Sequence, residues 1–66
     1  MYQQIITDIN ALIEQTKRKL SVYANLIENN KDSDALKDLL EYWFTYKKQL
    51  DQLYQDKAMI KDATKR

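Results

Sequence analysis

The feature that most restricts the fold of this 66-residue chain is the absence of both glycine and proline. Without glycine, no position takes a tight or left-handed turn at low cost, and without proline no residue interrupts a helix. Such a composition is typical of an all-α protein. The sequence therefore predicts long helices that are joined by few turns.

Apolar residues in both halves of the chain recur on a seven-residue grid, the pattern of a helix that buries one face. In the first half, position a holds Tyr2, Ile9, Thr16 and Tyr23, position d holds Ile5, Leu12, Lys19 and Leu26, and position e holds Ile6, Ile13, Leu20 and Ile27. In the second half, position a holds Leu36, Trp43, Leu50 and Lys57, position d holds Leu39, Tyr46, Leu53 and Ile60, and position e holds Leu40, Lys47, Tyr54 and Lys61. We expect one helix over residues 2–29 and a second over residues 34–63.

The segment ENNKDSD, residues 28–34, separates the two grids and has no apolar residue. Asn29 or Asn30 can take the left-handed conformation that ends many helices, and Asp32 or Ser33 can cap the start of the next. A link this short makes two helices antiparallel neighbours. The expected architecture is one domain, residues 1–66, that forms an antiparallel two-helix hairpin.

The pairing about this link sets Trp43 across from Thr16, the smallest residue of its column. A large ring beside a small residue is a plausible lock for the register of the two helices.

The first helix carries more apolar surface than one neighbouring helix can cover. An antiparallel coiled coil needs only positions a and d, whereas here position e is also apolar throughout. A chain this short also lacks the usual means of reinforcing a small core, since it has neither cysteine nor histidine. Because two-fold dimers are the commonest oligomers, we expect two hairpins to form a four-helix bundle.

The segment LLEYWFTY, residues 39–46, concentrates four aromatic rings in a chain that is otherwise strongly polar. On a helix its apolar side chains cover about 200° of the circumference, more than the hairpin alone can bury. We expect a second copy of the chain, or a different protein, to cover the surplus. The candidate interface residues are Leu40, Tyr42, Trp43, Phe44 and Tyr46, together with Ile6, Ile13, Leu20 and Ile27.

No constellation for catalysis or for a cofactor is recognisable in the sequence. Catalytic triads, thiol chemistry and zinc sites of histidine and cysteine are excluded, because neither residue type is present. Residues 30–41, NKDSDALKDLLE, match the oxygen positions of a calcium-binding loop, but Ala35 stands where the sharp turn needs glycine. We expect no enzyme activity, no cofactor and no bound metal.

Basic residues form a second candidate surface. Lys17, Arg18 and Lys19 are consecutive, and antiparallel pairing brings Lys47 and Lys48 to the same level. Five cations beside aromatic rings can bind nucleic acid, although the net charge of the chain is only +1. The alternative is a solvated face with local ion pairs, in which Glu14 pairs with Arg18 and Asp51 with Lys47.

The remaining expectations concern location and role. The N-terminal residues resemble no signal peptide, and no apolar run is long enough to span a membrane, so we expect a cytoplasmic protein. Nine lysines against two arginines hint at a low-GC bacterium or its phage. The sequence favours a small helical regulator or inhibitor that acts as a homodimer by binding another protein, with a nucleic-acid-binding hairpin as the alternative.

Overall fold

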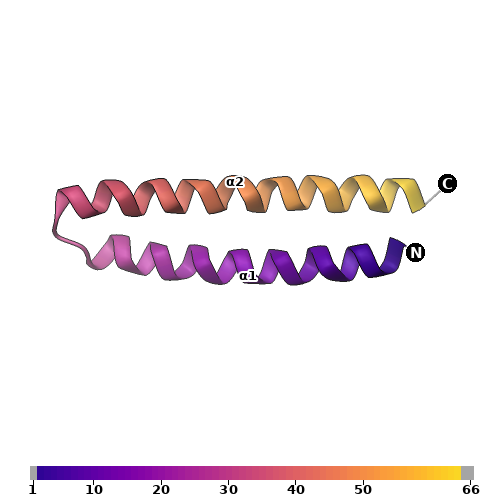
Figure 1. Ribbon diagram of the computed structural model, residues 1–66, viewed down its shortest axis with the longest axis horizontal. Helices are drawn as coiled ribbons and strands as arrows, with labels where there is room; N and C mark the ends of the chain where they lie inside the picture. Colours follow the sequence, from indigo (N-terminus) through magenta and orange to yellow (C-terminus); the bar gives the residue numbers. More distant parts are fainter. Residues whose placement is uncertain (1, 65–66) are drawn as a thin grey trace.

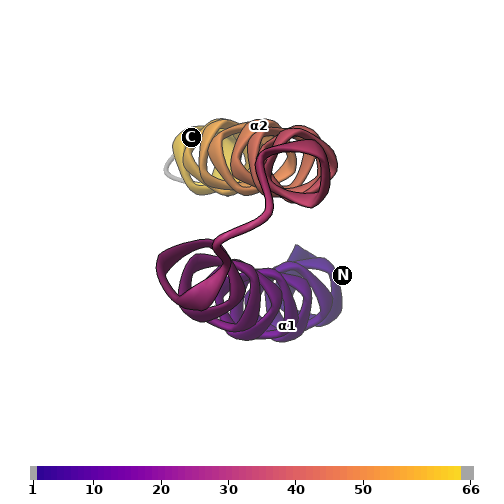
Figure 2. The same ribbon diagram turned by 90° about the vertical axis from the view of Figure 1, so that its left-hand side faces the viewer.

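The computed structural model describes residues 2–64, which form two long α-helices and one short link. Helix α1 spans Tyr2–Asn29, and helix α2 spans Ser33–Thr64. The helices run antiparallel in a single layer, with the link at one end and the start of α1 beside the end of α2 at the other (Figures 1 and 2). The predicted hairpin is confirmed, and its helices differ from the predicted bounds only in α2, by one residue at each end.

The hairpin is elongated. Its Cα atoms extend over 52 × 14 × 12 Å, and their radius of gyration is 15.3 Å. A compact domain of this length would have a radius of gyration of about 11 Å. Each helix has one neighbour and no more, so both flanks of the helix pair remain uncovered in the described part of the chain.

Side-chain caps, rather than a left-handed residue, shape the link between the helices. The Asp32 carboxylate accepts a hydrogen bond from the Asp34 amide at 3.1 Å, and the Asp32 carbonyl accepts one from the Leu36 amide at 2.9 Å. Asp32, one of the two predicted candidates, is therefore the N-cap of α2. The Asn30 side chain accepts a hydrogen bond from the Asp32 amide at 2.9 Å. No residue in the described range has a positive φ angle, so the predicted left-handed residue at Asn29 or Asn30 was wrong.

The core lies in the middle of the helix pair and is small. Ile9, Ile13 and Leu50 are its buried apolar residues, and Thr16 is buried beside them. The Thr16 hydroxyl donates a hydrogen bond to the Leu12 carbonyl at 2.7 Å, which satisfies its polar atom inside the helix. Three half-buried residues extend the core along the seam: Leu20, Leu53 and Ile60.

Helix α1 faces its neighbour with positions a and e, rather than a and d as predicted. Ile13 is only 4% exposed, and the rest of its column, Ile6, Leu20 and Ile27, is half-buried. Every member of the d column is exposed instead: Ile5, Leu12, Lys19 and Leu26. The physical reason is Lys19, because a seam of a and d would force its ammonium group toward the core. The e column is apolar throughout and carries no such cost.

The register also differs from the predicted one. Thr16 lies at the level of Gln49, with which it lines one hollow, whereas Trp43 lines a different hollow with Ala24 and Ile27. The first turn of α2 extends beyond the end of α1, which displaces the pairing along the hairpin (Figure 1). Trp43 therefore lies at the level of Ala24 rather than of Thr16, and the predicted lock between Trp43 and Thr16 was wrong.

Candidate interaction surfaces

The hairpin exposes far more large apolar side chains than it buries. Against three buried apolar residues, ten large ones are more than a third exposed within the described range. They are Tyr2, Ile5, Leu12, Val22, Leu26, Leu40, Tyr42, Phe44, Tyr54 and Met59. Isolated apolar residues are normal on a protein surface, but contiguous groups of them mark interaction sites. The two uncovered flanks of the helix pair are therefore the candidate sites.

The first candidate surface, named here the tyrosine flank, runs along the d column of α1 and one neighbouring column of α2. It comprises Ile5, Leu12, Lys19, Val22 and Leu26 from α1, and Ala35, Tyr42, Gln49, Asp56 and Ala63 from α2. Four of the α1 members are exposed apolar residues spread over about 30 Å of helix. This flank is long, largely apolar and poor in charge.

Three stacked tyrosines join α1 to α2 on the tyrosine flank. The Tyr23 ring lies between the rings of Tyr42 and Tyr46, with centroids 5.7 and 5.6 Å apart and planes inclined by 23° and 19°. The Lys19 ammonium lies 5.0 Å from the centroid of the Tyr46 ring, a cation–π contact. These contacts fix the relative height of the two helices and hold the Tyr42 ring in place, although Tyr42 remains 55% exposed.

Two hollows lie on the tyrosine flank. The first has a volume of about 260 Å³ and is lined by Leu12, Thr16, Gln49, Gln52 and Leu53. The second has a volume of about 320 Å³ and is lined by Arg18, Lys19, Val22, Tyr23, Leu26 and Tyr46. Both have mostly apolar walls, which suit the side chains of a facing helix.

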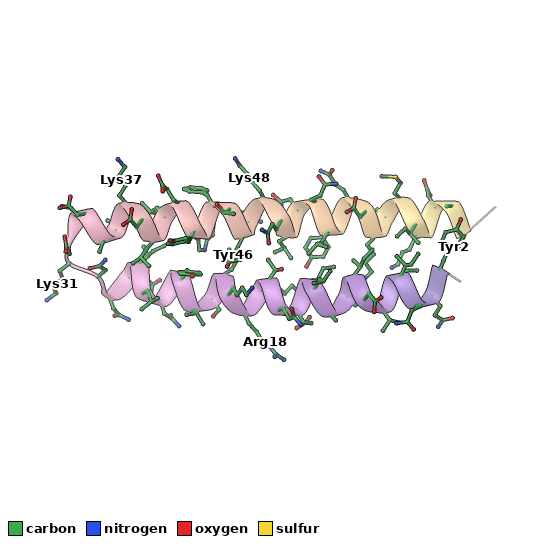
Figure 3. All side chains as sticks on the ribbon, in the orientation of Figure 1. Tyr2, Arg18, Lys31, Lys37, Tyr46 and Lys48 are labelled. Atoms are coloured by element: carbon green, nitrogen blue, oxygen red, sulfur yellow. The ribbon has the colours of Figure 1, made fainter. Side chains whose placement is uncertain are left out.

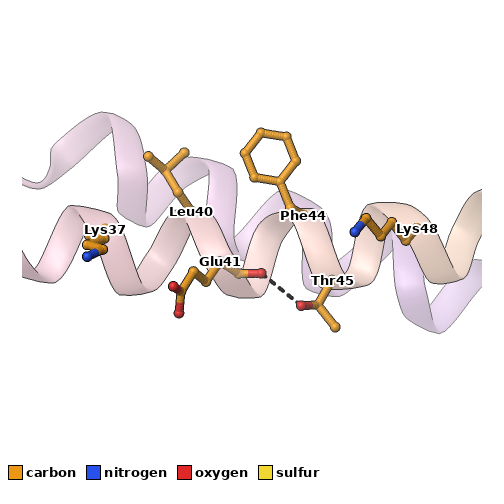
Figure 4. Close-up of a pocket in the computed structure, with 6 residues that line it drawn as sticks. All are labelled: Lys37, Leu40, Glu41, Phe44, Thr45 and Lys48. Atoms are coloured by element: carbon orange, nitrogen blue, oxygen red, sulfur yellow. Dashed lines mark hydrogen bonds between the residues drawn. The ribbon is translucent and has the colours of Figure 1, made fainter.

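The second candidate surface, the tryptophan flank, lies on the opposite side of the hairpin near the link. Trp43 and Phe44 meet edge to face, with centroids 5.2 Å apart and planes inclined by 85°. Both line a hollow of about 270 Å³, together with Ala24, Ile27, Glu28 and Leu40. A neighbouring hollow of about 550 Å³ is lined by Lys37, Leu40, Glu41, Phe44, Thr45 and Lys48 (Figure 4). Leu40 and Phe44 border both hollows and form a compact apolar group.

The structure divides the predicted aromatic group between the two flanks. Tyr42 and Tyr46 contact Tyr23 on the tyrosine flank, whereas Trp43 and Phe44 line the hollows of the tryptophan flank with Leu40. Tyr42 and Phe44 are two residues apart, and about 200° separates them around the helix. A single flat partner surface therefore cannot cover both rings, although both were predicted to belong to one interface.

The e column of α1 was also predicted to contact a second chain. In the structure it fills the seam of the hairpin itself: Ile13 belongs to the buried core, and Ile6, Leu20 and Ile27 are half-buried. The surplus apolar surface of α1 is the d column instead. The sequence shows that α1 has one apolar column more than a single neighbouring helix can cover. It does not show which of the columns stays exposed.

The predicted basic surface is dispersed. Arg18 and Lys48 point away from the hairpin on opposite outer sides (Figure 3). Lys17 pairs with Glu14 at 3.9 Å, where the sequence had suggested Arg18 as the partner of Glu14. Lys47 pairs with Asp51 at 3.4 Å, as expected, and Lys19 lies over the Tyr46 ring. The five cations do not form one continuous surface.

The acidic residues near the link serve the start of α2. Asp32 caps this helix, and Asp34, Asp38 and Glu41 lie along it rather than around a loop. Among residues 2–64, no three carboxylates gather in a geometry that could hold a metal ion.

Neither described helix has a segment that is both long and apolar enough to cross a membrane. No protein-family model matches the chain, and neither a curated protein nor a solved structure is significantly similar to it.

Proposed function

We propose that this chain is a non-enzymatic binding protein that works as a homodimer, in which two hairpins form a four-helix bundle that regulates or inhibits another protein. The observation that carries the proposal is the excess of exposed surface. The chain exposes 5432 Å², whereas a compact folded monomer of its mass exposes about 4,400 Å². The difference, about 1,000 Å² per chain, is close to what each partner contributes to a standard protein interface.

The size of the core supports the same conclusion. The three buried apolar residues found within residues 2–64 give one hairpin little stability, and no disulfide can reinforce it because the chain has no cysteine. Pairing of two hairpins adds buried apolar surface without lengthening the chain. In this proposal, dimerisation stabilises the fold of each hairpin and also forms the active binding protein.

The two flanks allow dimerisation and partner binding to use different surfaces. One flank can be buried between the two copies while the other stays exposed for a different protein. The tryptophan flank suits a protein partner, because it presents Trp43, Phe44 and Leu40 around a hollow, and aromatic side chains are enriched among the residues that dominate binding energy. Lys37 and Lys48 lie at its rim, where they favour an acidic partner.

Affinity capture from an extract of the native host tests this function. The immobilised wild-type chain is expected to retain one or more proteins after nuclease treatment, and Phe44→Glu is expected to lose them, because its carboxylate would face the apolar partner surface. The matched control is the charge reversal of Lys17 and Arg18, which line neither hollow of the tryptophan flank and should lower retention only modestly.

The opposite pattern would support the nucleic-acid alternative. If nuclease releases the retained material, and if the charge reversals abolish retention while Phe44→Glu does not, the proposed protein partner is refuted. Retention through phosphate contacts would also fall steeply as the salt concentration rises.

A further inference from the structure

We infer that the dimer forms through the tyrosine flank, with the links of the two hairpins at opposite ends of the bundle. The inference rests on the proposed homodimer and adds its interface and orientation. The occupant of the tyrosine flank is thus a second copy of this chain, and the tryptophan flanks face outward on both sides of the bundle.

The distribution of apolar residues selects the tyrosine flank. Five of its members are large apolar residues that are at least 43% exposed: Ile5, Leu12, Val22, Leu26 and Tyr42. They extend over most of the length of the hairpin, as a dimer seam requires. On the tryptophan flank, Leu40 and Phe44 lie near the link and Tyr54 lies farther along α2, and Lys47 and Lys61 interrupt the e column of α2 on both sides of Tyr54. A face with few charges loses less hydration when it is buried.

The d column of α1 is self-complementary when two copies run in opposite directions. Its four members are spaced by seven residues, and its centre lies midway between Leu12 and Lys19. Rotation about that point sets Ile5 beside Leu26 of the partner subunit, and Leu12 beside Lys19 of the partner subunit. The first contact is apolar on both sides, and in the second the aliphatic stem of lysine covers leucine while its ammonium group remains hydrated.

The neighbouring column of α2 has the same symmetry. It reads Ala35, Tyr42, Gln49, Asp56 and Ala63, with Gln49 at its centre. Rotation about Gln49 sets the small residues Ala35 and Ala63 against each other and places the Tyr42 hydroxyl near Asp56 of the partner subunit, to which it can donate a hydrogen bond.

One two-fold axis satisfies both columns. Thr16, next to the centre of the α1 column, lines the same hollow as Gln49, the centre of the α2 column. The contacts of Tyr23 with Tyr42 and of Lys19 with Tyr46 fix this relative height on the tyrosine flank. The two centres therefore lie at one level, and a single axis perpendicular to the helices passes near both.

The carboxylates oppose the other orientation. Asp8 and Asp56 lie at nearly the same level, because the contact of Lys19 with Tyr46 sets the height of the helices. With both links at the same end, these two carboxylates and their counterparts in the partner subunit would gather at one level, and like charges at such distances repel. With the links at opposite ends, the two acidic pairs lie far apart.

Cysteine cross-linking tests this arrangement directly, because the native chain has no cysteine. In Gln49→Cys the two thiols would meet at the two-fold axis, so a short bismaleimide is expected to convert most of the protein into covalent dimers. Phe44→Cys, on the tryptophan flank and more than half exposed, is the matched control and should remain monomeric on a denaturing gel.

A matched pair of charge substitutions provides a second measurement. Leu12 and Leu26 are both 47% exposed and belong to the same column. Leu26→Glu would face Ile5 of the partner subunit and should raise the dimer Kd at least about 100-fold, whereas Leu12→Glu would face Lys19 of the partner subunit and should change Kd less than about tenfold.

The outcomes separate this inference from the proposed homodimer. If the wild-type chain sediments as a monomer, the homodimer itself fails. If it sediments as a dimer but Phe44→Cys cross-links and Gln49→Cys does not, the homodimer stands and the tyrosine flank is refuted. Two results together would overturn the orientation of the hairpins. They are a dimer in which Gln49→Cys does not cross-link, and a larger increase in Kd for Leu12→Glu than for Leu26→Glu.

Discussion

At the scale of single residues, Lys19 decides how the hairpin is built. It occupies the third position of an otherwise apolar column, and its ammonium group lies over the Tyr46 ring instead of in the core. Burying that charge without a partner would cost more than α1 could recover from three leucine or isoleucine side chains. The helix therefore turns the complete column that contains Ile13 inward and leaves Leu12 and Leu26 at the surface.

The adjacent residues Ile13 and Leu12 test this assignment. Ile13 is 4% exposed and Leu12 is 47% exposed. Ile13→Ala is expected to lower the free energy of unfolding by about 2–5 kcal/mol, and Leu12→Ala by less than half of that, because only the first creates a cavity in the core. Urea denaturation of both variants, at a protein concentration low enough for the chain to be monomeric, measures the difference. Equal losses would show that the d column is as buried as the e column.

At the scale of the helices, local signals in the sequence predicted more than signals that depend on long-range geometry. The apolar period predicted both helices and nearly all their bounds, and Asp32 was among the two predicted caps of α2. The prediction that positions a and d of α1 face α2 was wrong, because it did not take the charge of Lys19 at position d into account. The predicted pairing of the two helices was also wrong, because the pairing depends on how far α2 extends beyond α1 at the link (Figure 1).

The sequence predicted how much apolar surface the hairpin exposes, but not where that surface lies. A surplus of apolar columns is visible in the sequence, whereas the division of Tyr42 from Phe44 depends on which side of the hairpin each ring meets. The position of the basic residues was likewise not predictable from their spacing in the sequence. Consecutive positions such as Lys17 and Arg18 point about 100° apart on a helix, so closeness in sequence did not produce a common surface.

Replacing the one charge in the d column tests the role of that column as a dimer seam. Lys19→Leu would make the column apolar throughout and place leucine beside Leu12 of the partner subunit. The dimer Kd is expected to fall at least about tenfold, since burial of a leucine outweighs an exposed cation–π contact. Lys47→Leu, on the other side of the hairpin, is the control and should leave Kd unchanged. Sedimentation equilibrium of both variants measures Kd, and equal changes would contradict the assignment.

At the scale of the whole molecule, the hairpin has the geometry of half a bundle. It is 52 Å long and only one layer thick, its core contains three buried apolar residues, and ten large apolar side chains remain exposed in the described range. A second copy on the tyrosine flank would bury one part of this surface and leave the tryptophan flank free. Folding, dimerisation and partner binding would then use different surfaces of one short chain.

The mass of the wild-type chain in solution tests the central claim of a homodimer most directly. Sedimentation velocity over a wide range of concentrations is expected to give one species of about twice the chain mass of 7.9 kDa, which dissociates only on strong dilution. The melting temperature should rise with protein concentration over the same range, because dimer formation stabilises the folded state by mass action. A single species of 7.9 kDa at every concentration, with a constant melting temperature, would contradict the account.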